Sequence, residues 1–358
     1  MPSWSLSLTL QRFQRSFRTM GIFTKRREVH DRMGALVDSI DQLLKACILL
    51  VLFVPFAQAQ ADQVIRVGFF PNITHAQALV ASNMSRGGAG WFESRMGQPV
   101  KIEWSIYNAG PSAMEAFFTK AIDMTYVGPS PVVNAHARAN GKEVRVMSGS
   151  MRGGEALVVR GDVITSADDL RGKTIATPQL GNTQDVECRA WLLAQGIKVT
   201  LVGGDARVIP TTNPDMLQLF TQKKLDAAWT VEPWVTRLIN EADGSIFHSD
   251  PNALTTVLAG RMGFLQEHPD LASKFLEAHQ GLTDWIQANP EEARRRVRDE
   301  LSAITRREMS QKLVDESWTR LHPNTSVSIE PFNEFLQHAR EVGFLRARVD
   351  LKNLLWQP

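Results

Sequence analysis

Short apolar runs alternate with longer segments of helical periodicity from Val64 to about residue 250. The run VIRVGFF at 64–70 is typical of a buried strand, and the segment HAQALVASNM at 75–84 carries its apolar residues at helical spacing. The same order recurs along the chain, with strands expected at 99–107, 122–128, 144–150, 155–161, 173–177 and 223–231, and helices at 111–120, 166–172, 185–195, 214–224 and 233–242. This order predicts an α/β fold in which parallel sheets are covered by helices.

The strand–helix order begins a second time in the middle of the chain, which indicates a second α/β lobe. After Asp250 the pattern changes, because 255–264 is typical of one more strand and 269–320 is nearly continuous helix with a break at Pro290. We expect the strand at 255–264 to return to the first lobe and to pair beside the strand at 155–161.

The second lobe therefore interrupts the first. Lobe I is predicted to comprise 62–158 and 252–358, including C-terminal helices, and lobe II to comprise 159–251. Each lobe is expected to be a mostly parallel sheet flanked by helices. Two chain crossings form a hinge, and ligands of such folds bind in the cleft at the carboxyl ends of the strands.

The first 61 residues differ in character from the rest. They carry eight basic and four acidic side chains, an apolar run ACILLVLFVPF at 46–56, and the small-residue pattern Ala57-Gln58-Ala59. The apolar run is too short to span a bilayer as a helix. Its basic flank and the A-x-A pattern predict a secretory signal peptide and export to the periplasm, with a buried core helix as the alternative.

Loss of this segment changes the charge balance. Of the 40 Lys and Arg and the 38 Asp and Glu, it leaves 32 basic and 34 acidic side chains, a net charge of about −2. This balance gives no support to nucleic-acid binding. Cys188 is then the sole cysteine, which excludes an intrachain disulfide and a cysteine-based zinc site.

The motifs point to binding rather than catalysis. The sequence has no G-x-S-x-G elbow, no H-E-x-x-H pair and no Cys–His pair, and its eight histidines are scattered without metal-ligand spacing. It also lacks the G-x-x-x-x-G-K-[ST] pattern of a nucleotide phosphate loop. No cofactor and no metal is predicted.

Candidate ligand-binding residues lie directly after predicted strands. Asn72 and His75 follow the first strand where a helix begins, so that free backbone N–H groups face an anion; their alternative roles are a helix cap and a surface histidine. Gly128 and Pro129 form a tight strand-to-helix corner that presents the hydroxyl of Ser130. Such a corner suits an oxyanion, and a merely capping serine is the alternative.

The turn PQLGNTQ at 178–184 is a third candidate. Gln179 lies at its beginning, Gly181 allows the turn, and Asn182 and Thr183 supply neutral side-chain donors at the start of a helix. A turn of neutral donors without a lysine suits reversible binding of a small oxyanion.

The fourth candidate is the stretch AAWTVEPWVTRL at 227–238. Trp229 offers a flat apolar wall, and Glu232 offers a carboxylate that suits a ligand ammonium or a ligand-bound water. The alternative is that the tryptophans only pack the corner between strands.

Four stretches also carry a family resemblance, in the same order along the chain. They are WSIYNAGPSAMEAFFTKAIDMTYVGPSPVV (104–133), ITSADDLRGKTIATPQLGNT (164–183), LDAAWTVEPW (225–234) and LKNLLWQP (351–358). From about Val64 to its end the chain resembles the periplasmic substrate-binding proteins of ABC importers for aliphatic sulfonates, taurine and nitrate.

The resemblance implies a two-lobed type II binding protein that closes on a small anion and delivers it to an ABC permease with a cytoplasmic ATPase. It implies a monomer without enzymatic activity. Ligand contacts would fall on the residues already selected, and Ser150 at the end of the strand 144–150 would lie on the same side of the cleft. Neutral donors match the three acceptor oxygens of a sulfonate.

The sequence also departs from the sulfonate and taurine branch, since FFPNITH follows its first strand and QLGNTQ stands where serine-rich turns are frequent. Two other classes therefore stay open. One is a related pyrimidine synthase of thiamine biosynthesis, or a protein that binds its pyrimidine, although the cysteine run of the synthases is absent. The other is a sensory module that reports ligand to a membrane partner.

Overall fold

The computed structural model describes residues 63–346 and 349–358. The chain divides into two units, residues 1–61 and 62–358, and the described residues belong to the second. The predicted signal peptide lies outside the described residues. No helix among the described residues is long and apolar enough to cross a membrane.

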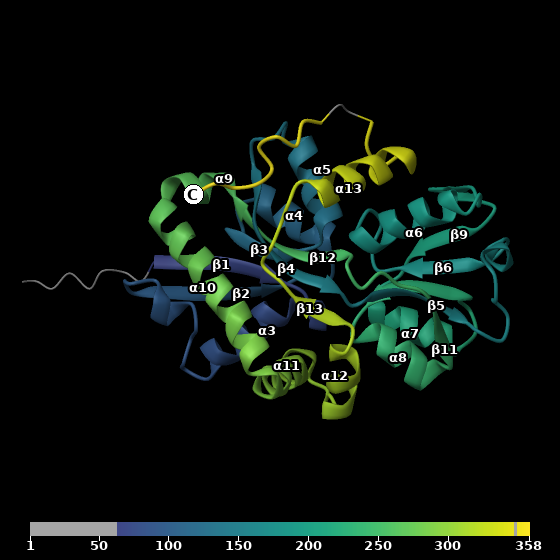
Figure 1. Cartoon of the computed structure of the whole chain (residues 1–358), viewed down its shortest axis with the longest axis horizontal. Helices are drawn as coiled ribbons and strands as arrows, with labels where there is room; N and C mark the ends of the chain where they lie inside the picture. The colour runs from purple at the N-terminus through teal and green to yellow at the C-terminus, as the bar shows by residue number, and fades with distance from the viewer. Residues whose placement is uncertain (1–62, 347–348) are drawn as a thin grey trace, which may run out of the picture. The chain divides into compact units, whose positions relative to one another are not determined.

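One sheet has six strands in the order β13-β4-β12-β3-β1-β2 (Figure 1). β1 runs parallel to β2 and β3, whereas β12 is antiparallel to β3 and β4, and β13 is antiparallel to β4. The strands are β1 Gln63–Phe69, β2 Val100–Ile106, β3 Met124–Val127, β4 Val144–Gly153, β12 Leu254–Arg261 and β13 Leu321–Pro323.

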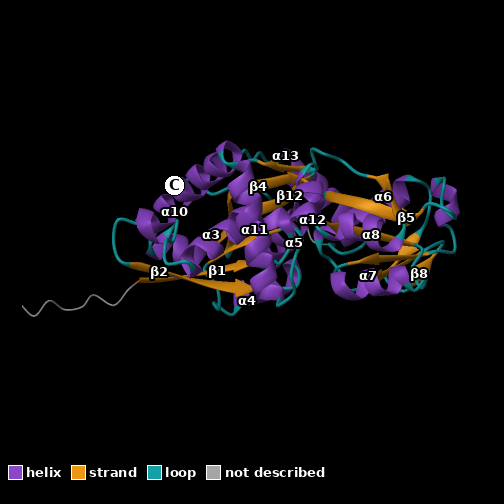
Figure 2. Ribbon diagram, turned by 90° about the horizontal axis from the view of Figure 1, so that it is seen from below, coloured by secondary structure: helices purple, strands orange, loops and turns teal. Residues whose placement is uncertain are grey.

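Helices cover both faces of this sheet, as Figure 2 shows. Alternate residues of each strand point to opposite faces, so the sheet supports two apolar clusters. One cluster lies beneath α3 Ala76–Arg86, α10 Pro269–Ala288, α11 Pro290–Thr305 and α12 Gln311–Trp318. The other lies beneath α4 Gly110–Phe118, α5 Pro129–Arg138 and α13 Glu330–Glu341.

The second sheet has five strands in the order β11-β5-β10-β6-β9. Leu157 and Val159 of β5 pack toward α6, whereas Ala156 and Val158 pack toward α7 and α8. The elements are β5 Glu155–Arg160, β6 Thr174–Thr177, α6 Thr183–Ala194, β9 Arg207–Pro210, α7 Asn213–Thr221, β10 Ala227–Val231, α8 Trp234–Ala242 and β11 Gly244–His248, with a small hairpin of β7 Val199–Thr200 and β8 Gly203–Gly204.

The α/β fold class is confirmed, but both sheets are mixed where a mostly parallel arrangement is expected. In the second sheet, β6 is parallel to β9 and β10, and β5 is antiparallel to β10 and β11. The chain passes from one sheet to the other between β4 and β5 and between β11 and β12, and each of these four strands takes part in an antiparallel pairing.

The expected pairing of the strand at 255–264 with 155–161 is wrong. That strand is β12, and it pairs with β3 and β4 of the six-stranded sheet. Gly153 ends β4 and Gly154 separates it from β5; they have φ of 68° and 76°, a conformation that glycine adopts without a steric penalty. The chain therefore turns out of the six-stranded sheet before Glu155, and β5 pairs with β10 and β11 instead.

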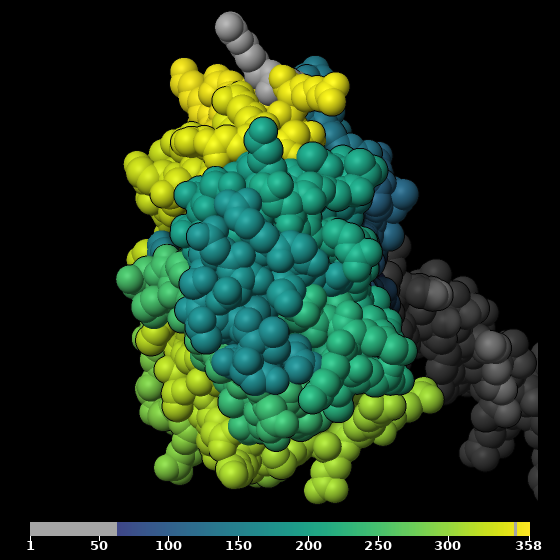
Figure 3. Space-filling model, turned by 90° about the vertical axis from the view of Figure 1, so that its right-hand side faces the viewer, coloured from purple at the N-terminus to yellow at the C-terminus, as the bar shows by residue number. Residues whose placement is uncertain are grey.

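The helical C-terminal region is confirmed. Pro290 begins α11 directly after α10, where its missing N–H group costs no helical hydrogen bond. The short helices are η1 Ile73–His75, η2 Glu93–Arg95, η3 Ala167–Leu170 and α9 Met262–Glu267. α13, which the sequence pattern does not single out, packs against α5 and α6 and so contacts elements of both sheets. Figure 3 shows the end of the molecule formed by the five-stranded sheet and its helices, with the yellow C-terminal segment along its upper edge.

Candidate binding pocket

One pocket lies between the two sheets, at the ends of their strands. Its lining residues follow β1 (Phe70, Asn72, Thr74, His75), β2 (Asn108, Ala109, Gly110), β3 (Gly128, Pro131) and β6 (Pro178, Asn182, Thr183, Gln184), together with Val231 of β10 and Thr255 of β12. The carboxyl ends of parallel strands are the usual ligand-binding edge of such sheets. No Lys, Arg, Asp or Glu is among these described lining residues.

Three helix N-termini converge on this pocket. α4, α5 and α6 are preceded by the N-cap residues Ala109, Gly128 and Asn182, and all three N-cap residues line the pocket. Pro111 of α4 and Pro129 and Pro131 of α5 have no N–H group, but the other first-turn N–H groups of the three helices have no intrahelical acceptor and carry partial positive charge. The pocket is therefore electropositive although its lining side chains are neutral, which is an arrangement that suits an anion.

Gly128 and Thr183 come from different sheets and approach each other closely. A Cβ atom on Gly128 would lie 2.2 Å from Thr183 Oγ1 and 3.2 Å from Thr183 Cβ. Thr183 is buried, and its hydroxyl has no hydrogen-bond partner among the described residues. A buried hydroxyl without a partner is costly, and a ligand oxygen at this position would remove that cost.

His75 is a neutral donor in the pocket. The backbone N–H of Phe70 donates to His75 Nδ1 at 3.4 Å, so the ring proton lies on Nε2. Burial lowers the pKa of His75 to about 3, and the imidazole is therefore uncharged at neutral pH. Nε2 has no partner among the described residues.

Asn72 lies where the two sheets meet. Its Oδ1 accepts a hydrogen bond from Trp234 Nε1 of α8 at 3.1 Å, and its neighbour Ile73 donates its backbone N–H to the carbonyl of Glu232 at 2.9 Å. The carbonyl side of the amide is thus engaged across the sheets. Asn72 lines the pocket, and its NH₂ group has no partner among the described residues.

The side chain of Asn182 is engaged within its own turn. Its Oδ1 accepts from the backbone N–H of Asp185 at 2.9 Å and its Nδ2 donates to Gln184 Oε1 at 3.0 Å. Asn182 is therefore the N-cap of α6, and its contribution to the pocket is to fix the free N–H groups of Thr183 and Gln184.

A buried ion pair that sequence reasoning missed supports this turn. Asp185 accepts hydrogen bonds from Thr177 Oγ1 at 2.8 Å, from the backbone N–H of Gly181 at 2.9 Å and from Arg189 Nε at 3.1 Å. Asp185 and Arg189 are both buried, and the guanidinium also donates to the carbonyls of β9 and the β7–β8 hairpin. The available signal is the Asp–Arg spacing of four within the predicted helix.

Gln179 and Gly181 belong to the same turn but do not line the pocket. Gln179 hydrogen-bonds to the hydroxyl of Ser112 on α4 at 3.2 Å, a contact between elements of the two sheets. Gly181 has a φ of 75° and supplies the turn itself. Ser130 is buried in the first turn of α5 beside the pocket residues, and its Oγ has no partner among the described residues.

Three further candidates lie away from the pocket. Trp229 packs beneath α6, with ring centroids 6.2 Å from Trp191 and 5.6 Å from His248. Glu232 is buried and accepts from Arg320 Nε at 2.6 Å; burial raises its pKa, and this ion pair opposes the shift. Ser150 Oγ donates to Gln77 Oε1 at 2.9 Å on the far side of the sheet from the pocket helices.

The pocket also contains residues that sequence reasoning did not select, above all Gln184 and the Asn108–Ala109–Gly110 turn. Gly110 and Pro111 mark the start of α4 directly after a strand, and this signal was available in the sequence. Within the described ranges, no group of three or more His, Cys, Asp or Glu residues is placed to hold a metal ion.

The fold is that of the periplasmic binding proteins. The alkanesulfonate-binding protein SsuA from Xanthomonas axonopodis pv. citri, solved with MOPS bound, superimposes with a TM-score of 0.69 at 16% identity, covering 83% of this chain and 99% of that one. The nitrate-binding protein NrtA from Synechocystis PCC 6803 gives a TM-score of 0.65 at 15% identity, with 80% and 83% covered.

The chain belongs to the NMT1-like family, whose model matches residues 58–299. Among curated proteins, the taurine-binding periplasmic protein of Escherichia coli (strain K12) is 24% identical over 196 residues. This match covers 53% of this chain and spans only 59% of that relative's length. The sequence match thus shows the family, and the structural matches show the fold.

Proposed function

We propose that this protein is the periplasmic solute-binding component of an ABC importer and that it captures a small oxyanion, such as an aliphatic sulfonate, taurine or nitrate. The observation that carries the proposal is the convergence of three helix N-termini on a pocket lined by neutral groups. The names of the similar proteins, which bind taurine, alkanesulfonate or nitrate, support the same ligand class.

Neutral donors suit a ligand that must be released again. A lysine or arginine in the pocket would hold an anion by a full charge, whereas N–H and O–H dipoles replace its hydration without one. We assign direct ligand contacts to Asn72, His75, Gly128 and Thr183, and to the free backbone N–H groups of Thr183 and Gln184. Ser130 is a further donor within the same corner, and Gln179 acts at the rim by its contact with α4.

The remaining predicted residues act indirectly in this proposal. Glu232 holds Arg320 near the chain crossing, Ser150 anchors α3 through Gln77, and Trp229 supports the inner face of α6. None of these three side chains requires contact with the ligand for its effect.

Ligand capture would proceed by closure of two lobes, with lobe I formed by 62–158 and 252–358 and lobe II by 159–251. The chain would be exported by its N-terminal signal and would act in the periplasm as a monomer. The loaded protein would dock on an ABC permease that is driven by a cytoplasmic ATPase. No chemical step on the ligand is part of this function.

Isothermal titration of the chain without residues 1–61 against methanesulfonate, taurine and nitrate tests the proposal. Micromolar or tighter binding of one of them is expected, and binding weaker than millimolar by all three contradicts it. The aminopyrimidine precursor of thiamine belongs in the same panel, because His75 lines the pocket and a pyrimidine synthase of the related kind would consume its own histidine. Binding of the pyrimidine alone would establish that alternative instead.

A further inference from the structure

The buried carboxyl group of Glu155 lies next to the residues that line the pocket. Glu155 is the first residue of β5, is 7% exposed, and lies opposite Val231 of the pocket in the β5–β10 ladder. Its Oε2 accepts a hydrogen bond from Gln184 Nε2 at 2.6 Å. Since Gln184 lines the pocket and is the second residue of α6, one side chain separates this carboxyl group from the proposed anion site.

The hydrogen bonds form a directed chain. Asn182 Nδ2 donates to Gln184 Oε1, and Gln184 Nε2 donates to Glu155. This chain fixes the orientation of both amides, and with them the N-cap of α6 and the free N–H groups that face the pocket. Glu155 therefore terminates the network that positions the α6 end of the site.

No cation among the described residues pairs with Glu155. The charged groups that act on it are acidic: Glu187 of α6 and Asp250 after β11 both raise its pKa, and Glu187 is bound to His338 of α13. Glu232, the residue after its ladder partner Val231, is bound to Arg320. His248 of β11 lies opposite Leu157 in the ladder and packs on Trp191 and Trp229. The pKa of Glu155 is raised to about 8, and burial is the largest cause.

An ionised carboxylate at this position would oppose the binding of an anion, because it would cancel part of the positive potential at the N-terminus of α6. A protonated carboxyl group keeps the hydrogen bond from Gln184 and adds no charge. We infer that Glu155 is a positioning residue that holds the pocket competent for an anion only while it carries a proton. This inference rests on the proposed function and deepens it, because it makes ligand affinity depend on the protonation of one named residue.

The test is the dissociation constant of methanesulfonate between pH 6 and pH 9.5. Methanesulfonate stays anionic throughout this range, and His75, with its pKa of about 3, stays neutral. Wild-type affinity is expected to fall roughly tenfold as Glu155 ionises above pH 8. This is the effect expected of Coulomb repulsion between the carboxylate and a bound anion in a partly buried site. Glu155→Gln retains the acceptor for Gln184 but cannot ionise, so its affinity is expected to be independent of pH. Glu103→Gln, which changes an exposed carboxylate of β2, is the matched control and should follow the wild type.

An equal loss of affinity in Glu155→Gln and the wild type above pH 8 would overturn the inference and leave the proposed function intact. Absence of methanesulfonate, taurine and nitrate binding at every pH would overturn both. The wild type alone gives a second test that needs no variant: anion binding at pH 8 should take up a fraction of a proton, measured by titration in buffers of different ionisation enthalpy. Zero uptake contradicts the inference.

Discussion

Gly128 and Thr183 face each other across the pocket so closely that a methyl group on Gly128 would overlap the hydroxyl of Thr183 at 2.2 Å. Gly128 precedes α5 beside the six-stranded sheet, and Thr183 begins α6 beside the five-stranded sheet. This contact brings two of the three helix N-termini together. The proposed anion site is therefore assembled when Gly128 and Thr183 lie in contact.

Gly128→Ala is predicted to weaken ligand binding by tenfold or more, because the added methyl group keeps α5 and α6 apart. Rotation of the Thr183 side chain relieves only part of the overlap, since Thr183 Cβ would still lie 3.2 Å away. Titration with the tightest ligand of the panel measures the effect. Gly87→Ala is the control, because a Cβ there approaches nothing closer than 3.5 Å and its φ of −78° suits alanine. Equal affinities of the two variants would show that this contact plays no part in binding.

Thr183→Val is predicted to weaken anion binding by about 1.5–3 kcal/mol, because a hydrogen bond from a hydroxyl to a charged group is lost while the shape is kept. The free protein should gain slightly in stability, since the hydroxyl has no partner among the described residues. Thr183→Ser retains the donor and serves as the matched variant in the same titration. Wild-type affinity in Thr183→Val would place the ligand elsewhere.

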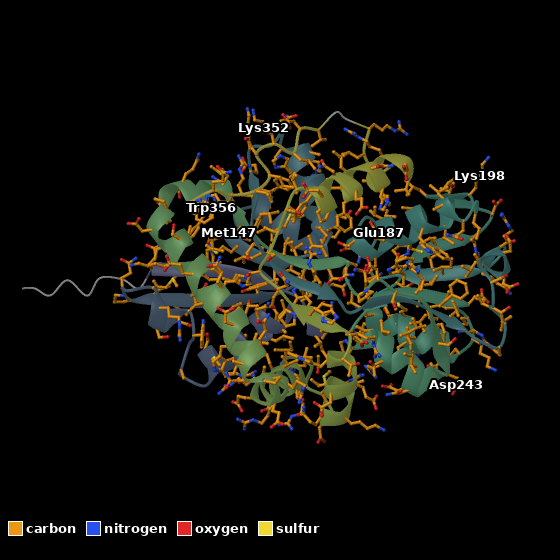
Figure 4. All side chains as sticks on the ribbon, in the orientation of Figure 1. Met147, Glu187, Lys198, Asp243, Lys352 and Trp356 are labelled. Carbon is orange, nitrogen blue, oxygen red and sulfur yellow. The ribbon has the colours of Figure 1, made fainter. Side chains whose placement is uncertain are left out.

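His338 of α13 and Glu187 of α6 form an ion pair of 2.9 Å between elements of the two sheets. Figure 4 labels Glu187 where α6 approaches α13. The hydrogen bond to Glu187 is the largest cause of the raised pKa of His338, and burial opposes it. The protonated histidine is thus favoured in the folded protein, so its stabilisation is complete below about pH 6.5 and is lost as pH rises through the raised pKa.

The expected contribution is about 0.5–1 kcal/mol at pH 6, because both side chains are partly exposed. Urea unfolding of the wild type and His338→Gln at pH 6 and pH 9 measures it, and the difference in free energy of unfolding should shrink at the higher pH. His322→Gln, which changes an exposed histidine of β13, is the control. A difference that stays constant between the two pH values would contradict the predicted linkage.

Asp185→Asn is predicted to cost about 3–5 kcal/mol of folding free energy, because it leaves the buried guanidinium of Arg189 without its carboxylate. The turn at Gly181 should loosen with it, since its N–H donates to the same carboxylate. Denaturant unfolding measures the loss. The double variant Asp185→Asn, Arg189→Met should be less destabilised than the single variant, and the opposite order would mean that the pair is not the cause.

The order of strands and helices was predictable because apolar periodicity is a local property of the sequence. Pairing was less predictable, as β5 shows. Whether the strand after Gly153 and Gly154 continues the first sheet or enters the second depends on two backbone angles, and both outcomes bury the same alternating valines and leucines.

Within the candidate site, too, local signals were predictable and contacts between distant residues were not. Asn72, His75, Gly128, Asn182 and Thr183 were selected by their position after strands, and the pocket brings all five together. Such positions are visible in the sequence because strand ends and helix caps are local signals.

Trp229 and Glu232 come from the fourth predicted strand end, and the places of their side chains depend on distant partners. The ring of Trp229 lies on the face of β10 that α6 covers, and the carboxylate of Glu232 is bound by Arg320, 88 positions away. No local sequence pattern indicates that α6 covers Trp229 or that Arg320 binds Glu232. Glu155 was overlooked for the same reason, because its role arises from Gln184.

A crystal structure of residues 62–358 grown with methanesulfonate would show whether the three helix N-termini hold the anion. We expect the sulfonate oxygens within hydrogen-bond distance of Thr183 Oγ1 and of backbone N–H groups in the first turns of α4, α5 and α6. An empty pocket at a saturating concentration, or a sulfonate bound away from these three N-termini, would contradict this expectation.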